Sequence, residues 1–201
     1  MPFAELPAFF AELAQVSGTA SMALRFTILT ATRTSEALRA CWYEIDDDVW
    51  QIPAERMKSR RPHRVPLTEP VLQILGALPR IEGNPYIFAG MRRGQPLSNM
   101  SLLQVMRSQG YGVGGHRGDY VPHGFRSTFR DWCGECTHYP TNVAEAALAH
   151  VLGNKTEAAY ARGDLFEKRR ALMATWAAFC IGGALTNHLE MPYRQGGIRS
   201  R

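Results

Sequence analysis

The sequence predicts a mainly helical domain that carries a small antiparallel β-sheet. Apolar residues recur at helical spacing over most of the chain, as in Leu172, Trp176 and Phe179 near its end. Only the stretch 42–67 contains short β-prone runs, and two of them are separated by the turn residues 46–48. The length of 201 residues suits one domain with a single core.

The first half of the chain contains the segments that should form the sheet. Gly18 separates two amphipathic stretches, and Glu36 suits the positive N-terminal end of a short helix that begins after Arg33. Pro66 cannot donate to a ladder, so its strand should lie at an edge. We expect helices at 3–16, 21–31 and near 34–36, and strands at 42–45, 49–52 and 64–67.

The pattern of the second half predicts helices and no strands. Pro122 is placed to open a helix, because its missing N–H costs nothing in the first turn. Gly153 should stop another helix, and Asn154 with Glu157 resembles a capping box for the next. We expect one domain over 1–185 and a flexible C-terminal tail at 186–201. The expected helices are 68–78, 98–109, 122–135, 142–151, one carrying Tyr160 and one from Asp164.

Charge and composition favour a polyanionic partner. The net charge is +5 and the pI is about 9.2, and apart from Lys58, Lys155 and Lys168 the basic residues are arginines. Arginine suits bidentate contacts to phosphate but cannot readily give up a proton. No secretory signal peptide is recognisable, and the apolar stretch 171–185 is too short to span a bilayer. We therefore expect a cytoplasmic protein with no membrane partner.

Six residues form an ordered set with the chemistry of phosphodiester cleavage. Two arginines can stabilise charge on the non-bridging oxygens, and a histidine can add a hydrogen bond or a proton. A lysine among arginines can protonate a leaving oxygen, and a tyrosine can act as a nucleophile beside positive charge. The candidate catalytic residues are Arg33, Lys58, His123, Arg126, His150 and Tyr160.

Each of these residues taken alone has an ordinary structural explanation. Arg33 can be a cap-region arginine, Lys58 part of a solvated basic hairpin and Tyr160 a core tyrosine. The Cys133-x-x-Cys136 pair with a nearby histidine is a weak zinc signal, because no second ligand pair follows. We therefore expect no metal and no cofactor site.

In combination, the residues resemble the catalytic domain of tyrosine recombinases, most closely prophage and genomic-island integrases. The resemblance covers about residues 5 to 180, and its motifs agree in order, spacing and local context. The stretches that carry it are Thr30-Ala31-Thr32-Arg33-Thr34-Ser35-Glu36-Ala37-Leu38, Ile52-Pro53-Ala54-Glu55-Arg56-Met57-Lys58, Pro122-His123-Gly124-Phe125-Arg126-Ser127-Thr128, and 148–155 continuing to 159–164.

The resemblance implies a role for each candidate residue. Arg33 and Arg126 match the two phosphate-binding arginines, and Lys58 matches the lysine of the strand-connecting hairpin. His123 matches the histidine of the His-x-x-Arg pair, His150 stands where the family has His or Trp, and Tyr160 matches the nucleophile. The implied reaction cleaves one DNA strand to a 3′-phosphotyrosine and a free 5′-hydroxyl, followed by strand exchange and religation.

The implied partners are double-stranded DNA and further copies of the protein, in a tetrameric synapse of the full-length enzyme. The implied purpose is integration or excision of a mobile element carried by a phage or bacterium. The family usually has an N-terminal core-binding domain, which we expect to be absent from this chain because the first catalytic-domain helix begins near Met1. A type IB topoisomerase-like relaxation activity and a non-catalytic DNA-binding remnant are the alternative functions.

Overall fold

The computed structural model describes residues 1–112, 114–150 and 164–183, and it confirms a mainly helical fold with a small antiparallel sheet. The expected helix carrying Tyr160 and the expected tail at 186–201 lie outside the described residues. The helices are α1 (Leu6–Ala14), α2 (Thr19–Thr30), α3 (Thr34–Leu38), α4 (Glu69–Gly76), α5 (Asn99–Ser108), α6 (Phe125–Cys136), α7 (Thr141–Ala147) and α9 (Phe166–Cys180). The strands are β1 (Ile45–Asp46), β2 (Val49–Ile52) and β3 (His63–Pro66), and 3-10 turns lie at Phe3–Glu5, Trp42–Glu44, Ala54–Arg56 and Pro122–Gly124.

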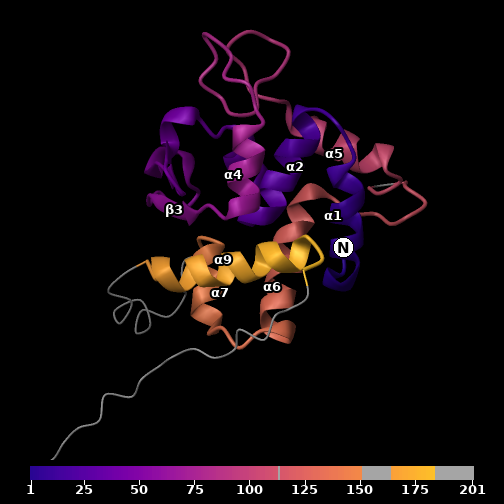
Figure 1. The fold of residues 1–201 in the computed structure, drawn as a ribbon, viewed down its shortest axis with the longest axis vertical. Helices are drawn as coiled ribbons and strands as arrows, with labels where there is room; N and C mark the ends of the chain where they lie inside the picture. The colour runs from indigo at the N-terminus through magenta and orange to yellow at the C-terminus, as the bar shows by residue number, and fades with distance from the viewer. Residues whose placement is uncertain (113, 151–163, 184–201) are drawn as a thin grey trace, which may run out of the picture.

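Helix α9 lies at the centre of the fold. It crosses the middle of the view in Figure 1, with α2 and α4 on one side and α6 and α7 on the other. Its Trp176 is fully buried, and the indole Nε1 donates to the carbonyl of Ile28 in α2 at 2.9 Å. The same ring packs on Trp132 and Phe129 of α6, with centroids 5.0 and 5.2 Å away. This aromatic cluster therefore fixes α2, whose C-cap Ala31 accepts a hydrogen bond from Arg126, relative to α6, which carries Arg126.

The sheet has the strand order β1-β2-β3, with antiparallel pairing throughout. Trp50 and Ile52 of β2 are buried while Gln51 between them is exposed, which is the alternation expected of a half-buried strand. Pro66 lies in the edge strand β3, as its missing N–H predicts. The long connection between β2 and β3 contains Lys58.

Two expected elements are wrong in detail. Residues 42–44 form a 3-10 turn instead of a strand, because the carboxylate of Glu44 accepts the backbone N–H of Cys41 at 3.2 Å. The helix expected at 142–151 ends at Ala147, and Ala149 adopts a left-handed conformation with φ 51°. His150 therefore projects from a turn that follows α7 and not from a helix.

Candidate active site

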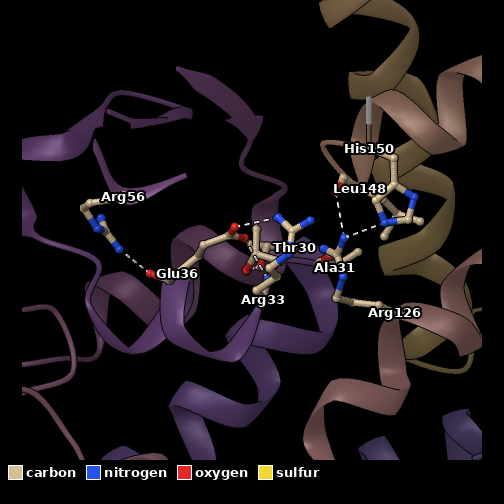
Figure 2. Close-up of polar contacts among 9 residues, drawn as sticks. Thr30, Ala31, Arg33, Glu36, Arg56, Arg126, Leu148 and His150 are labelled. Carbon is tan, nitrogen blue, oxygen red and sulfur yellow. Dashed lines mark hydrogen bonds and ion pairs between the residues drawn. The ribbon is translucent and has the colours of Figure 1, made fainter. Parts of the chain in front are cut away.

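Arg126 bridges the C-terminal ends of two helices (Figure 2). It lies in the first turn of α6 and is 7% exposed. Its Nη1 donates to the carbonyl of Ala31 at 2.6 Å, and its Nη2 donates to the carbonyl of Leu148 at 2.7 Å. These two residues cap the C-termini of α2 and α7, where carbonyls lack intrahelical partners and carry partial negative charge. The guanidinium is therefore held in one place by two separate helices.

Arg126 also keeps donors for a ligand. Burial and the positive charge of Arg33 together lower the pKa of Arg126 to about 10, although Glu36 and Glu145 act to raise it. The side chain still carries its charge at neutral pH. Of the five N–H donors of a guanidinium, the described residues engage three, through Ala31, Leu148 and His150. Two donors remain for an anionic oxygen.

Arg33 is held by Glu36. The Arg33 backbone N–H donates to Oε2 of Glu36 at 2.8 Å, and its Nη1 donates to Oε1 at 2.7 Å. Because α3 begins at Thr34, the Glu36 carboxylate caps the helix and orients the arginine at once. The Glu36 side chain is 3% exposed, whereas the Arg33 side chain is 21% exposed. The Arg33 guanidinium is thus held by Glu36 on one side, and part of its surface remains exposed.

His150 stands between Glu145 and Arg126 (Figure 2 shows its contact with Arg126). Its Nε2 lies 3.1 Å from Nη2 of Arg126, and its Nδ1 lies 2.5 Å from Oε2 of Glu145. An arginine can only donate, so Nε2 accepts and the ring proton resides on Nδ1, which donates to Glu145. The same carboxylate accepts from Nε of Arg130 at 2.7 Å. The contacts therefore select one tautomer of His150.

Glu145 remains ionised in this arrangement. Its partial burial acts to raise its pKa, but hydrogen bonds from Arg130 and His150 outweigh burial and hold the pKa below its ordinary value. An ionised Glu145 can orient the imidazole in the way that carboxylates orient catalytic histidines.

Lys58 and His123 are exposed side chains on two different connections. Lys58 lies in the turn between β2 and β3, and His123 lies in the 3-10 turn that precedes α6. His123 and Arg126 are therefore not on one face of a regular helix, as their spacing had indicated, because α6 begins only at Phe125. Within the described ranges, no hydrogen bond or ion pair joins either residue to the arginines.

The structure thus brings three of the six candidate residues together. Arg33, Arg126 and His150 form one cluster, built from α3, α6 and the turn after α7. Lys58 and His123 lie outside its hydrogen bonds, and Tyr160 lies outside the described residues. We call Arg33, Arg126 and His150 the cationic cluster.

A second ionic network lies between α9 and β3. Asp164 accepts two hydrogen bonds from Arg64, at 2.8 and 2.9 Å, and one from Nη2 of Arg169 at 3.0 Å. Arg169 is 1% exposed, and its Nη1 also donates to the carbonyl of Arg64 at 2.5 Å. Hydrogen bonds from Arg64 lower the pKa of Asp164. This network fastens the start of α9 to the sheet.

The interpretation of the sequence missed the residues that hold the cluster. Glu145 precedes His150 by five residues, and side chains at that spacing do not face each other on a helix. The two side chains meet only because the chain turns at Ala149. Arg56 and Glu44 meet across twelve residues, so no local pattern could have paired them. Glu36 was the exception, since its position three residues after Arg33 was recognisable as a cap.

The described residues offer little support for metal binding. They contain no group of three or more histidine, cysteine or acidic side chains placed to hold a metal ion. Burial raises the pKa of Cys133 to about 12, so its thiol stays protonated. In this part of the chain, moreover, no helix is both long enough and apolar enough to cross a membrane.

Comparison with known proteins gives a consistent picture. The sequence pattern of the phage integrase family matches residues 2–165. The prophage integrases IntA and IntZ of Escherichia coli K12 are 38% and 33% identical, and each alignment covers 88% of this chain. The same alignments cover 43% and 44% of those proteins, so the chain spans less than half of their length.

A solved structure has the same fold. Lambda integrase residues 75–356, as a dimer bound to a COC′ core site, superimpose with a TM-score of 0.55 at 20% identity. The match covers 82% of this chain and 59% of that one.

Proposed function

The chain belongs to the phage integrase family, and from that membership we propose that it is the catalytic domain of a site-specific DNA recombinase. The observation that carries the proposal is the cationic cluster, in which two guanidiniums and an imidazole from distant parts of the chain are held together. Guanidinium groups held in this way can donate hydrogen bonds to two neighbouring anionic oxygens, and the non-bridging oxygens of a phosphodiester are such a pair. The net charge of +5 supports a DNA partner.

We assign the phosphate to Arg33 and Arg126. The positive charge of Arg33 is close enough to lower the pKa of Arg126, and the Arg33 side chain is 21% exposed. During attack on phosphorus, negative charge grows on the two non-bridging oxygens, and fixed donors stabilise that charge without reorganising. His150 adds a hydrogen-bonding group beside Arg126, and His123 is proposed to reach the same phosphate from the turn before α6.

The covalent step uses Tyr160 as the nucleophile. Its phenol gives up its proton to solvent, the phenolate oxygen forms a bond to phosphorus, and the bond from phosphorus to the 5′-oxygen breaks, which leaves a 3′-phosphotyrosine. Lys58 gives a proton to the departing 5′-oxygen, a transfer that arginine cannot readily perform. The phosphotyrosine is itself a diester, so a 5′-hydroxyl can reverse the step and no nucleotide cofactor is needed.

Recombination requires more than one copy of the protein on DNA. The lambda integrase dimer bound to its core site supports self-association of this chain on double-stranded DNA, and a tetramer would join two sites. Integration or excision of a mobile element is the proposed role, in line with the prophage integrases among its relatives.

The test is a nicked DNA duplex that releases the cleaved end and traps the covalent product. The chain should form a denaturant-resistant adduct with this duplex, and Tyr160→Phe should abolish the adduct while leaving non-covalent binding intact. Tyr43→Phe is the matched control, because Tyr43 is 76% exposed and should be dispensable. An adduct that persists in Tyr160→Phe would refute the assignment, and binding without any adduct would favour the non-catalytic alternative. Relaxation of supercoiled plasmid without strand exchange would favour a topoisomerase-like activity.

A further inference from the structure

The connection between β2 and β3 carries four basic side chains, and one of them faces the protein. Lys58, Arg60 and Arg61 are exposed. Arg56 instead has a side chain that is 18% exposed, and it lies over the ring of Trp50 with 6.0 Å to the centroid. A basic hairpin of a DNA-binding protein is expected to point its charges at phosphates. Arg56 departs from that pattern and requires a different explanation.

Both ends of the Arg56 guanidinium are engaged. Nη1 forms an ion pair with Oε2 of Glu44, and Nη2 donates to the backbone carbonyl of Glu36 (Figure 2 shows the second contact). Glu44 is itself fixed, because the same oxygen accepts from Nε1 of Trp50 at 2.9 Å and from the backbone N–H of Cys41. The Glu44 side chain is 2% exposed, so the ion pair has a buried carboxylate at one end. Removing one partner of such a pair is costly.

Glu36 connects this ion pair to the cationic cluster. Its carboxylate holds Arg33 through two hydrogen bonds, while its backbone carbonyl receives Arg56. Arg33 and Arg56 are therefore fixed to the same residue of α3. The position of the hairpin relative to Arg33 is set by this shared attachment.

Lys58 follows this attachment point closely. Met57, which is 2% exposed, is packed in the core between Arg56 and Lys58. The backbone is also fixed by a hydrogen bond from the Arg60 N–H to the Met57 carbonyl at 3.1 Å. The Lys58 backbone thus has two anchored residues immediately before it, although its side chain reaches into solvent.

We propose that Arg56 is a positioning residue that fixes the Lys58 turn relative to Arg33, so that the lysine meets the leaving oxygen of a phosphate bound by that arginine. This rests on the proposed function, in which Lys58 is the proton donor. Arg56 would touch neither DNA nor the reacting atoms. A lysine in its place could pair with Glu44 but could not reach the Glu36 carbonyl at the same time, because it lacks the planar fork.

The experiment compares two nicked duplexes, one with a normal phosphodiester and one with sulfur as the 5′-bridging atom. A thiolate leaves without a proton, so the second duplex bypasses the lysine. Arg56→Lys should slow adduct formation about tenfold or more on the normal duplex and should recover to near the parental rate on the sulfur duplex. The double variant Arg56→Lys with Lys58→Gln should be no slower than Lys58→Gln alone. Glu55→Gln, a change in an exposed neighbour that carries no positive charge, should match the parent on both duplexes at saturating DNA.

The outcomes separate the positioning role from the assignment of Lys58. Equal slowing of Arg56→Lys on both duplexes, with Lys58→Gln rescued by sulfur, would overturn the positioning role alone. Failure of sulfur to rescue Lys58→Gln would overturn both, because Lys58 would then not be the proton donor. An unchanged rate for Arg56→Lys on the normal duplex would also overturn the positioning role. If Arg56→Lys does not fold, Glu44→Gln removes the charge at the other end of the ion pair and should give the same pattern.

Discussion

Acidification from pH 8 to about pH 5 should destabilise the folded chain through His63. This residue begins β3, where it pairs with Ile52, and it is partly buried. Burial, assisted by the positive charges of Arg169 and Arg126, lowers the pKa of His63 to about 4. The Ala147 backbone and Asp164 act in the opposite direction without offsetting these effects. The folded state thus keeps His63 neutral.

The direction and the size of this change in the free energy of unfolding follow from the pKa values of His63 in the folded and unfolded states. In the unfolded chain the ring has its ordinary pKa of 6.5, so it binds a proton there more readily than in the folded state. The contribution of neutral His63 to the free energy of unfolding is therefore fully present above about pH 6.5, and it is lost as the pH falls toward 4. At pH 5 the loss amounts to about 2 kcal/mol, or about 4–8 °C in Tm for a chain of this size. Carboxylates with lowered pKa values, such as Glu145 and Asp164, act mainly below this window.

The measurement is the free energy of unfolding in urea at pH 8 and at pH 5, for the parent and for His63→Gln. The variant has no proton to gain at this position, so the difference in stability between the two pH values should shrink by about 2 kcal/mol. His138→Gln is the matched control, because His138 is exposed and the parental pH dependence should persist. If His63→Gln loses as much stability as the parent between pH 8 and pH 5, His63 is not buried as a neutral base.

Three further predictions concern the cluster, the ionic network and DNA affinity. Arg33→Ala and Arg126→Ala should each slow covalent adduct formation about a hundredfold or more in single-turnover assays, the scale of losing one preorganised donor. Arg169→Met should lower the free energy of unfolding by about 3 kcal/mol, because the buried guanidinium holds Asp164 and the Arg64 carbonyl, whereas Arg170→Met at a more exposed ion pair should lower it by less than about 1 kcal/mol. Affinity for random duplex DNA should fall steeply with added salt in an anisotropy titration, since basic side chains that bind phosphates release counterions.

Local patterns were sufficient for most of the fold. The β2 strand was predicted at its observed bounds because Trp50 and Ile52 alternate with an exposed Gln51, a signal that resides in the strand itself. The 3-10 turn at 42–44 was missed because it depends on where the Glu44 carboxylate goes. The early end of α7 was missed for a similar reason, since its last carbonyl is satisfied by Arg126, which is 22 residues away in the sequence.

The sequence likewise identified some residues of the candidate site and not others. Residue type and order identified Arg33, Arg126 and His150, and the structure places these three together. Glu145, which holds His150, and Arg56, which holds the Glu36 carbonyl, could not be predicted, because each acts through a fold-dependent contact and not through a motif. The sequence therefore indicated which groups lie together, whereas the structure was needed to find what holds them.

What holds them also explains why a cluster of positive charge is stable in the fold. Each member of the cluster has a negative or electron-rich partner on the protein side: Glu36 for Arg33, two helix-end carbonyls for Arg126, and Glu145 for the Nδ1–H of His150. Arg33 nevertheless lowers the pKa of Arg126, so part of their mutual repulsion is not compensated. A phosphate placed between the two guanidiniums would remove that repulsion, and its binding energy would then add to the stability of the fold. On the proposed function, the positive charge that the protein partners leave unbalanced would also favour the transition state, because the negative charge on the non-bridging oxygens is greatest there.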